Sequence, residues 1–446
     1  MRDELYSNLG FYNSAFIKMH VHCTEDLSDI TQLSIHSEAT YFHEYIHFLQ
    51  DITTSYGLMN ISSIVDYIKA VNSEALKDRQ MDFNVPFTPI ASTVDDVKAN
   101  WELKSIYLGG GSGHNDIAKV NSVTTVVHPV QTKNGWISPK KLVLDYDDST
   151  GNNYKTFIGA HCIAESMAYI MEQILYPGTL PPASKLPYES VKIVCDFIHP
   201  SFSSDPLNII ALCDACMMFF NPGHILFDAI TEMAKTRYMP HVPDNVYNYI
   251  YSKITFQYMG STNINNLYSN TSAVASQQFK DYFTTPVFKD NKDWIDLVFT
   301  NALHLRLSRP NFMLDLVRNG KLIENSIISN VEYKNLSDLL GTPIIVNDSY
   351  KLFFQAPART SFDLRYKYLW VINQIYKIYR NGLNQGTYRC EMIDWCDARA
   401  LDKNIASFTS YDCRNSPWIR AAEDQPNECA FSRLWYTWGM LNEYPV

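Results

Sequence analysis

Two histidines, separated by three residues, lie in a stretch whose apolar positions repeat at the spacing of an α-helix. The stretch runs from Leu33 to Thr53, and it contains His43, Glu44 and His47 without any proline or glycine. Residues four apart lie one above the other on a helix, so the two imidazoles can face the same metal ion. The pattern constrains the fold strongly, because a second element has to meet this helix and supply a further ligand.

The two ends of this expected helix also carry signals. Ser34 or Ser37 is suited to cap its first turn, and Glu38 suits the positive end of the helix dipole. We expect Gly57 to end the helix. The run from Ala15 to Cys23 alternates and has the β-branched and aromatic content of a strand, so a strand is expected to lead into the helix.

Glu44 is the residue of the motif that suits catalysis. It follows His43 directly and is therefore rotated away from the two imidazoles, where its carboxylate can reach a water on the metal. Zinc lowers the pKa of a bound water from about 15.7 towards roughly 7. A neighbouring carboxylate can accept the proton as the water attacks a carbonyl, so we predict that Glu44 is a general base.

A catalytic zinc usually has three protein ligands and a water, so a further carboxylate or histidine is needed. We predict Glu165, in a helical stretch from Phe157 to Leu175, because small residues around it allow a close approach to the first helix. These small residues are Gly159, Ala160, Ala164 and Ala168. Asp66 and Glu74, near or within a helix expected over residues 61–76, remain the alternatives.

Three polar residues share a helix face with Glu165. Glu172 lies seven residues further along, where it can orient a ligand histidine. His161 and Tyr169 lie four residues to either side of Glu165, and either is a candidate to stabilise the oxyanion that forms when water adds to a carbonyl.

Three other histidines lie near the motif. His36 is seven residues before His43, roughly 10 Å along the helix axis, and is too remote to share its ion. His20 and His22 lie on one face of the expected strand and can bind metal, but no residue near them in the sequence completes a set of ligands.

The segment around His43, Glu44 and His47 resembles the zincin metallopeptidases, whose active-site helix carries HExxH. Gln50 and Thr53 replace the glycine and third histidine of the metzincin extension, which disfavours that subclass. The helix around Glu165 looks like the second ligand helix of gluzincins, although it lacks the thermolysin-type NExxSD pattern. The resemblance implies Zn²⁺ held by His43, His47 and Glu165, with Glu44 as the catalytic base.

Composition narrows the class of protein. The formal net charge of -10 over 446 residues argues against a general nucleic-acid binder, which needs a basic surface. The opening residues do not have the pattern of a secretory signal, and no apolar run is long enough to span a membrane, so we expect a cytoplasmic protein. The sequence leaves open whether its C-terminal cysteines bind a structural metal; these are Cys390, Cys396, Cys413 and Cys429.

The predicted fold class is α+β, with three regions. Residues 1–180 are expected to form a zincin-like catalytic domain, with a small sheet, the motif helix and a second ligand helix. Residues 181–320 form a helical region that completes the cleft, and residues 321–446 form a mixed α/β region containing tryptophans and cysteines.

The function expected from this reading is zinc-dependent hydrolysis of peptide bonds in a protein or peptide substrate. Two alternatives remain. One is a zincin-like module that binds a protein partner without catalysis, and the other is a zinc hydrolase that acts on a non-peptide amide.

Overall fold

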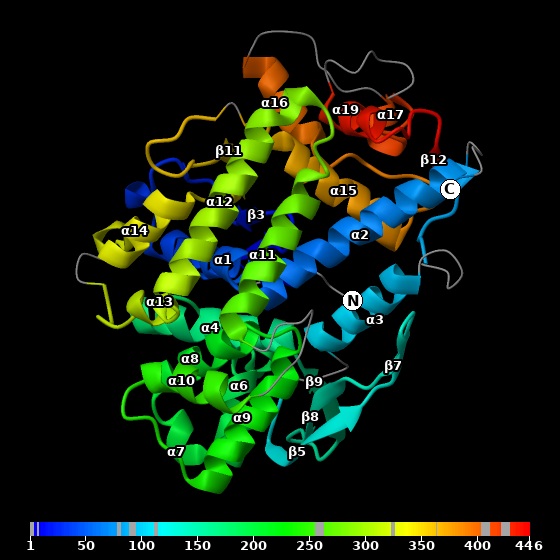
Figure 1. The fold of residues 1–446 in the computed structure, drawn as a ribbon. Helices are drawn as coiled ribbons and strands as arrows, with labels where there is room; N and C mark the ends of the chain where they lie inside the picture. The colour runs from blue at the N-terminus through cyan, green and yellow to red at the C-terminus, as the bar shows by residue number, and fades with distance from the viewer. Residues whose placement is uncertain are drawn as a thin grey trace.

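The computed structural model describes the chain except for residues 1–3, 7–8, 78–81, 89–94, 111–114, 255–262, 323–325, 363, 403–410 and 421–428. Helices dominate, and they surround two small sheets and two short strand pairs (Figure 1). The α+β class is therefore confirmed.

A five-stranded sheet joins three N-terminal strands to two strands from residues 344–353. Its strands, in spatial order, are β1 (Glu4–Tyr6), β2 (Gly10–Asn13), β3 (Lys18–Val21), β10 (Ile344–Asn347) and β11 (Leu352–Phe353). Neighbours are antiparallel except for β3 and β10, which run parallel with Asn347 opposite Val21. The strand expected over residues 15–23 is shorter, because Ala15 and Ile17 adopt positive φ in a turn. Such backbone is rare in strands.

The motif helix is α1 (Ile35–Thr53), which lies near the middle of the molecule (Figure 1). Ser34 caps it and Glu38 lies in its first turn, as expected. Every residue from Glu38 to Thr53 is buried, so α1 is enclosed on all sides.

The expected end of α1 at Gly57 is wrong. The helix ends at Thr53, and Gly57 lies in the first turn of α2 (Ser55–Lys77). A side chain at Gly57 would lie 2.3 Å from the carbonyl oxygen of Asp51, so glycine lets α2 begin directly against the last turn of α1. The Thr54 hydroxyl accepts a hydrogen bond from the Gly57 amide.

The helix that carries Glu165 is α4 (Ala160–Leu175), and it runs antiparallel to α1. Glu38, near the start of α1, accepts a hydrogen bond from the hydroxyl of Tyr176 after the end of α4. At the other end, the Gln50 side-chain amide donates to the carbonyl oxygen of Ala164. These two contacts fix the register of the helix pair.

The remaining elements cover this pair. An antiparallel sheet and a hairpin follow α3 (Asp95–Leu108); they are β5 (Lys119–Val127), β8 (Lys140–Asp147) and β9 (Asn153–Ile158), with β6 (Val130–Thr132) and β7 (Gly135–Ile137). The helices after α4 are α5 (Lys185–Tyr188), α6 (Ser190–Ile198), α7 (Pro200–Ser203), α8 (Pro206–Met217), α9 (Pro222–Thr236), α10 (Asp244–Lys253), α11 (Ile264–Lys280), α12 (Lys289–Ser308), α13 (Phe312–Asp315) and α14 (Val331–Leu340). The last part holds α15 (Lys367–Asn381), α16 (Ile393–Asp402), α17 (Tyr411–Asn415) and α19 (Ala430–Thr437), with β4 (Asp82–Phe83) paired to β12 (Tyr444–Pro445).

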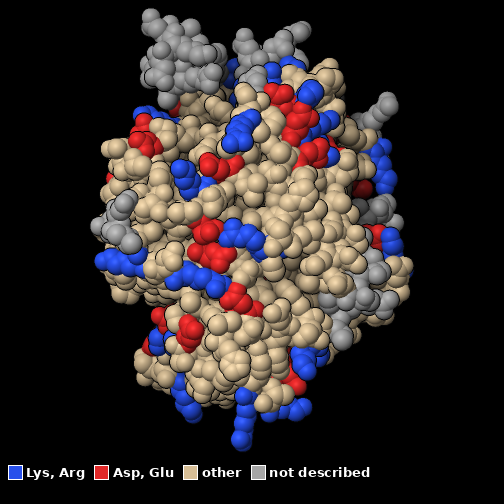
Figure 2. All heavy atoms as spheres, turned by 60° about the vertical axis from the view of Figure 1, so that its left-hand side comes forward, with Lys and Arg blue, Asp and Glu red and all other residues tan. Residues whose placement is uncertain are grey.

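One large hydrophobic core extends from Tyr12 in β2 to Met440 near the C-terminal end, and a small separate cluster of Ala99, Ile106 and Val130 joins α3 to β6. The large core crosses both boundaries of the three-region division, which stays a prediction. On the face seen in Figure 2, acidic and basic side chains are interspersed. Among the helices that the structure describes, none is both long and apolar enough to cross a membrane.

Candidate metal centre

The structure brings the three predicted ligands together between α1 and α4. His43 Nε2 lies 3.2 Å from Glu165 Oε2, and His47 Nε2 lies 3.6 Å from the same oxygen. All three ligand atoms fall within 4.8 Å of one another. They can therefore contact a single metal ion, which the sequence pattern required.

These three side chains are almost completely buried, at 3% exposure for His43, 1% for His47 and 0% for Glu165. Within the described part of the chain, His47 Nε2 and Glu165 Oε1 have no hydrogen-bond partner. Buried polar atoms are normally hydrogen-bonded, because leaving one unpaired costs about 1–3 kcal/mol. A metal ion between α1 and α4 would satisfy such atoms, so the donor set fits a cation.

The charges of the site lead to the same conclusion. Burial opposes the charged form of His43, but hydrogen bonds to Glu165 and Glu172 outweigh it and raise its pKa well above the usual value. Burial likewise opposes a charged Glu165, yet the neighbouring imidazoles of His47 and His43 hold its pKa far below the usual value. These shifts favour a proton on His43 beside the carboxylate of Glu165, and a metal cation can take the place of that proton.

Two further side chains orient the histidines. Glu172 Oε2 lies 2.9 Å from Nδ1 of His43, so the expected contact with a ligand histidine is present. Gln50 Oε1 lies 2.8 Å from Nδ1 of His47, and the other end of the same side chain is anchored to α4. Because an amide oxygen only accepts, this bond places a proton on His47 Nδ1 and leaves the Nε2 lone pair facing Glu165.

Glu44 directly follows His43 on α1 and is close enough for its charge to act on that imidazole. Its side chain is 0% exposed, and its charge contributes to raising the pKa of His43. Burial is the main cause of the raised pKa of Tyr188, and the charges of Glu165, Glu44 and Glu172 add to it. Glu44 therefore lies within electrostatic reach of both the ligand set and a tyrosine hydroxyl.

Tyr188 is a site residue that sequence reasoning missed. It ends the short helix α5, and its ring centre is 6.1 Å from that of His43. Tyr169, which the sequence offered as a candidate to stabilise the oxyanion, packs its ring against that of Tyr188, with ring centres 5.6 Å apart. No local pattern marks residue 188, because it reaches the site only after the chain turns back from α4.

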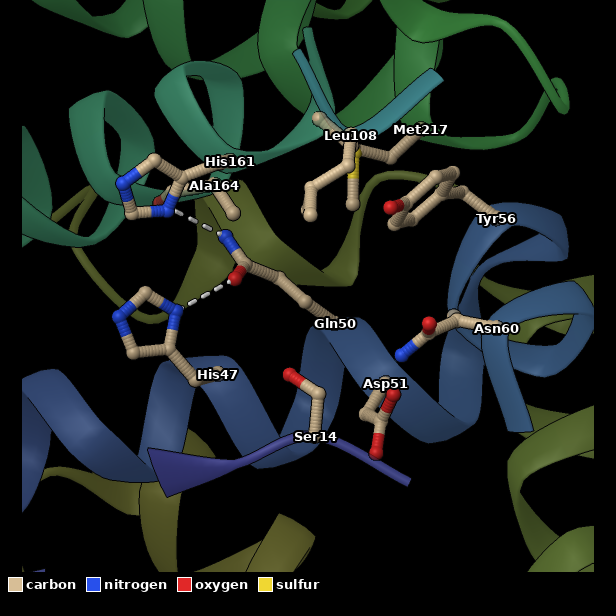
Figure 3. Close-up of a pocket in the computed structure, with 12 residues that line it drawn as sticks. Ser14, His47, Gln50, Asp51, Tyr56, Asn60, Leu108, His161, Ala164 and Met217 are labelled. Carbon is tan, nitrogen blue, oxygen red and sulfur yellow. Dashed lines mark hydrogen bonds between the residues drawn. The ribbon is translucent and has the colours of Figure 1, made fainter. Parts of the chain in front are cut away.

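A small pocket opens beside His47 and His161 (Figure 3). Its volume is about 30 Å³, which is room for one or two water molecules. The imidazole of His161 lies over Gln50 and His47, and its Nδ1 has no partner among the described residues. Burial lowers the pKa of His161, which favours its neutral form. His161 is thus placed to contact a small ligand.

The alternative third ligands lie elsewhere. Asp66 accepts a hydrogen bond from Gln278 on α11, and Glu74 pairs with Lys77. His36 is exposed at the start of α1. Among the described residues, two groups have metal-ligand geometry: the buried group, and a second one formed by His20, His22 and Asp348. The C-terminal cysteines belong to neither of these groups.

Comparison of this chain with family models, with curated proteins and with solved structures gives no match.

Proposed function

We propose that this protein is a zinc-dependent hydrolase that cleaves peptide bonds, with Glu44 as the general base. The observation that carries the proposal is the convergence of His43, His47 and Glu165 on one point, with the buried carboxylate of Glu44 within electrostatic reach of His43. The resemblance of the motif to zincins supports a peptide bond over other amides.

The distances support zinc as the ion. Zinc binds nitrogen and carboxylate oxygen at about 2.0–2.2 Å, and the edges of such a tetrahedron are about 3.3–3.6 Å. The distances from Glu165 Oε2 to His43 Nε2 and to His47 Nε2 are 3.2 and 3.6 Å, close to these values. Two histidines and one glutamate also leave the fourth position for a water or a substrate, as catalytic zinc sites do.

Each side chain then has a defined task. The bound metal supplies Lewis acidity, which activates water and polarises the scissile carbonyl. Glu44 accepts the proton of the attacking water and returns it to the leaving amine. Neutral His161 and the hydroxyl of Tyr188, whose pKa is raised, can donate hydrogen bonds to the developing oxyanion. Glu172 and Gln50 keep the two imidazoles in place.

The burial of the site favours a second candidate, a closed metal centre that stabilises a protein-binding module. His43, His47, Glu44 and Glu165 are at most 3% exposed, so an extended peptide does not reach the ligand position in this conformation. Under the first proposal, elements around the site have to part for substrate. Under the second, the fourth ligand position serves no substrate.

The test compares zinc content and cleavage in wild type, Glu44→Gln and the matched control Glu74→Gln, which changes an exposed glutamate on α2. A diverse peptide library, analysed by mass spectrometry, reports cleavage. We expect one zinc in the buried centre of all three proteins, and a loss of about 10²- to 10⁴-fold in rate for Glu44→Gln alone.

Wild-type rates in a zinc-loaded Glu44→Gln protein would rule out Glu44 as the base. If wild-type protein holds the buried zinc but cleaves neither peptides nor small amides, the closed metal centre is supported instead.

A further inference from the structure

A second group of metal-binding side chains lies outside the buried centre, at the junction of β3 and β10. It consists of His20 and His22 from β3 and its end, and of Asp348, which follows β10 directly. The sequence pattern placed the two histidines on one face but offered no partner. Asp348, more than 320 residues away along the chain, completes the set.

Both histidines point a ring nitrogen at the same carboxylate oxygen. Asp348 Oδ1 lies 2.8 Å from His20 Nε2 and 3.0 Å from His22 Nδ1. The ring centres of the two histidines are 4.6 Å apart. The distances of 2.8 and 3.0 Å are hydrogen-bond lengths, so the side chains have to move slightly apart for the two nitrogens and the oxygen to serve as three ligands of one ion.

The sheet register holds these residues in position. Because Asn347 pairs with Val21 across the parallel β3 and β10 strands, the next residue of each strand, Asp348 and His22, comes side by side. The Asp348 amide donates to the carbonyl oxygen of Cys23, which extends the pairing beyond the strand ends. The three ligand atoms are therefore brought together by backbone pairing.

Two neighbours stiffen the arrangement further. The ring of Phe11 stacks on His20, with centres 5.1 Å apart and an interplanar angle of 7°. The side chain of Asn347 accepts hydrogen bonds from the amides of Ser349 and Lys351, which folds the chain tightly after Asp348. A site held on strands and a tight turn loses little freedom when it binds an ion.

We propose that His20, His22 and Asp348 form a second metal site, which binds Zn²⁺ through two imidazole nitrogens and one carboxylate. The ion replaces the two N–H hydrogen atoms that point at Asp348 Oδ1, so His20 binds through Nε2 and His22 through Nδ1. Each neutral imidazole then carries its hydrogen on the other ring nitrogen. Water completes the coordination, because half the site faces solvent: the side chains of His22 and Asp348 are each 43% exposed.

The second site differs from the buried centre in strength and consequence. Two of its three ligands, His22 and Asp348, are exposed, and both histidines are already hydrogen-bonded to Asp348, so it binds zinc more weakly and exchanges it faster. Binding there ties residue 20 to residue 348 and so joins β3 to β10. Zinc at the second site therefore stabilises the five-stranded sheet, independently of any hydrolysis at α1.

The experiment titrates Zn²⁺ into the full chain by calorimetry, after removal of metal, and compares wild type with His22→Gln and Asp348→Asn. His36→Gln, an exposed histidine on α1, is the matched control. We expect His22→Gln and Asp348→Asn each to bind one zinc fewer than wild type and than the control. The weaker binding event is the one that disappears, and the tight event remains.

A second measurement follows the thermal unfolding midpoint as zinc is raised above one equivalent. Wild type and His36→Gln should gain stability in this range, and the two site variants should not. Equal zinc stoichiometry in wild type and both site variants would overturn the proposal. Because each comparison is a difference between variants, its outcome does not depend on whether the buried centre catalyses a reaction.

Discussion

The carboxylate of Glu172 binds Nδ1 of His43, the ring nitrogen that does not face the other two ligands. Its Oε2 accepts a hydrogen bond from Nδ1 at 2.9 Å, and the side chain is buried. Outer partners of this kind raise the basicity of a ligand imidazole and fix its orientation. Their loss typically weakens metal binding by about 10- to 100-fold.

We therefore expect Glu172→Gln to bind zinc about 10- to 100-fold more weakly at the buried centre, because a neutral amide polarises His43 less. Competition with a chelator of known affinity measures the change. Glu74→Gln serves as the control on the surface of α2 and should match wild type. An unchanged affinity in Glu172→Gln would mean that this hydrogen bond does not act on the metal.

Asp51 is a buried carboxyl on the last turns of α1, and it gives the fold a pH dependence of its own. Burial raises its pKa from 3.8 to about 7, although the Ala15 amide and the Tyr12 hydroxyl donate hydrogen bonds to it. The folded protein keeps this proton when the unfolded chain has lost it. The stabilising contribution is therefore full below about pH 4 and is lost as the pH rises to 7.

Asp51→Asn should remove this dependence. Relative to the variant, wild type should lose up to about 1.4 kcal/mol of unfolding free energy per pH unit between pH 5 and 7. Urea unfolding of both proteins at several pH values measures the difference between their unfolding free energies. The contributions of the other titrating groups cancel in this difference, because both proteins contain them. A difference that stays constant with pH would show that Asp51 is ionised in the folded protein throughout.

The residues of the buried centre were predictable to different degrees. His43, Glu44 and His47 are adjacent on one helix, so their geometry follows from helical spacing alone. Glu165 was found through its small neighbours, since close helix packing needs them. Tyr188 was not found, because it reaches the buried centre only through the path of the chain after α4. Asp348 of the second metal-binding group was not found, because the register of β3 and β10 brings it to His20 and His22.

At the scale of elements, the C-terminal end of α1 is fixed by Arg306 on α12. Its guanidinium donates to the carbonyl oxygen of Thr53 at 2.8 Å and forms a two-pronged pair with Asp214 on α8, at 2.7 and 2.9 Å. The hydroxyl of Tyr247 on α10 also donates to Asp214. A cation at this end also complements the helix dipole.

Arg306→Leu should cost about 3–5 kcal/mol of unfolding free energy, because Asp214 and Thr53 would be left buried without their partner. Chemical unfolding measures the cost. The double variant Arg306→Leu with Asp214→Leu should recover part of it, since no charge then remains buried. The control Arg309→Leu removes a half-exposed pair, and we expect it to cost roughly 1 kcal/mol or less.

The elements themselves were predicted unevenly. The long helices around residues 43 and 165 were anticipated because their apolar periodicity is strong. The ends were less certain, as the error at Gly57 shows: a glycine stop and a glycine in a tight helix junction look alike in sequence. The pairing of β3 with β10 was outside any local pattern, because both strands are short and lie far apart in the chain.

At the scale of the whole molecule, one core encloses the metal centre, so metal binding and folding should be coupled. When the free zinc concentration is 100 times the dissociation constant of the folded chain, zinc binding adds about 2.7 kcal/mol to the unfolding free energy. We expect removal of zinc by a chelator to lower the unfolding midpoint of wild type. Glu165→Gln should lose most of this response, and Glu74→Gln should keep it.

Thermal unfolding with and without zinc, followed by circular dichroism and by tryptophan fluorescence, measures the coupling. The two probes should report the same midpoint, because the core is continuous from β2 to the C-terminal helices. A zinc response in Glu165→Gln as large as that of wild type would show that the stabilising ion binds elsewhere. The three-region division would gain support if the two probes gave separate transitions.

The central position of α1 has a consequence for biosynthesis. Among the described residues, the last one hydrogen-bonded to a ligand histidine is Glu172, but α1 also needs Arg306 and the amide of Ile327, which donates to Glu38. The ribosome adds about 5–20 residues per second, so the 155 residues from 172 to 327 take roughly 8 to 31 s. Throughout that interval the nascent chain carries all three ligands but lacks the residues around 306 and 327 that pack against α1. A hydrolase with this topology would form its active centre only late in translation.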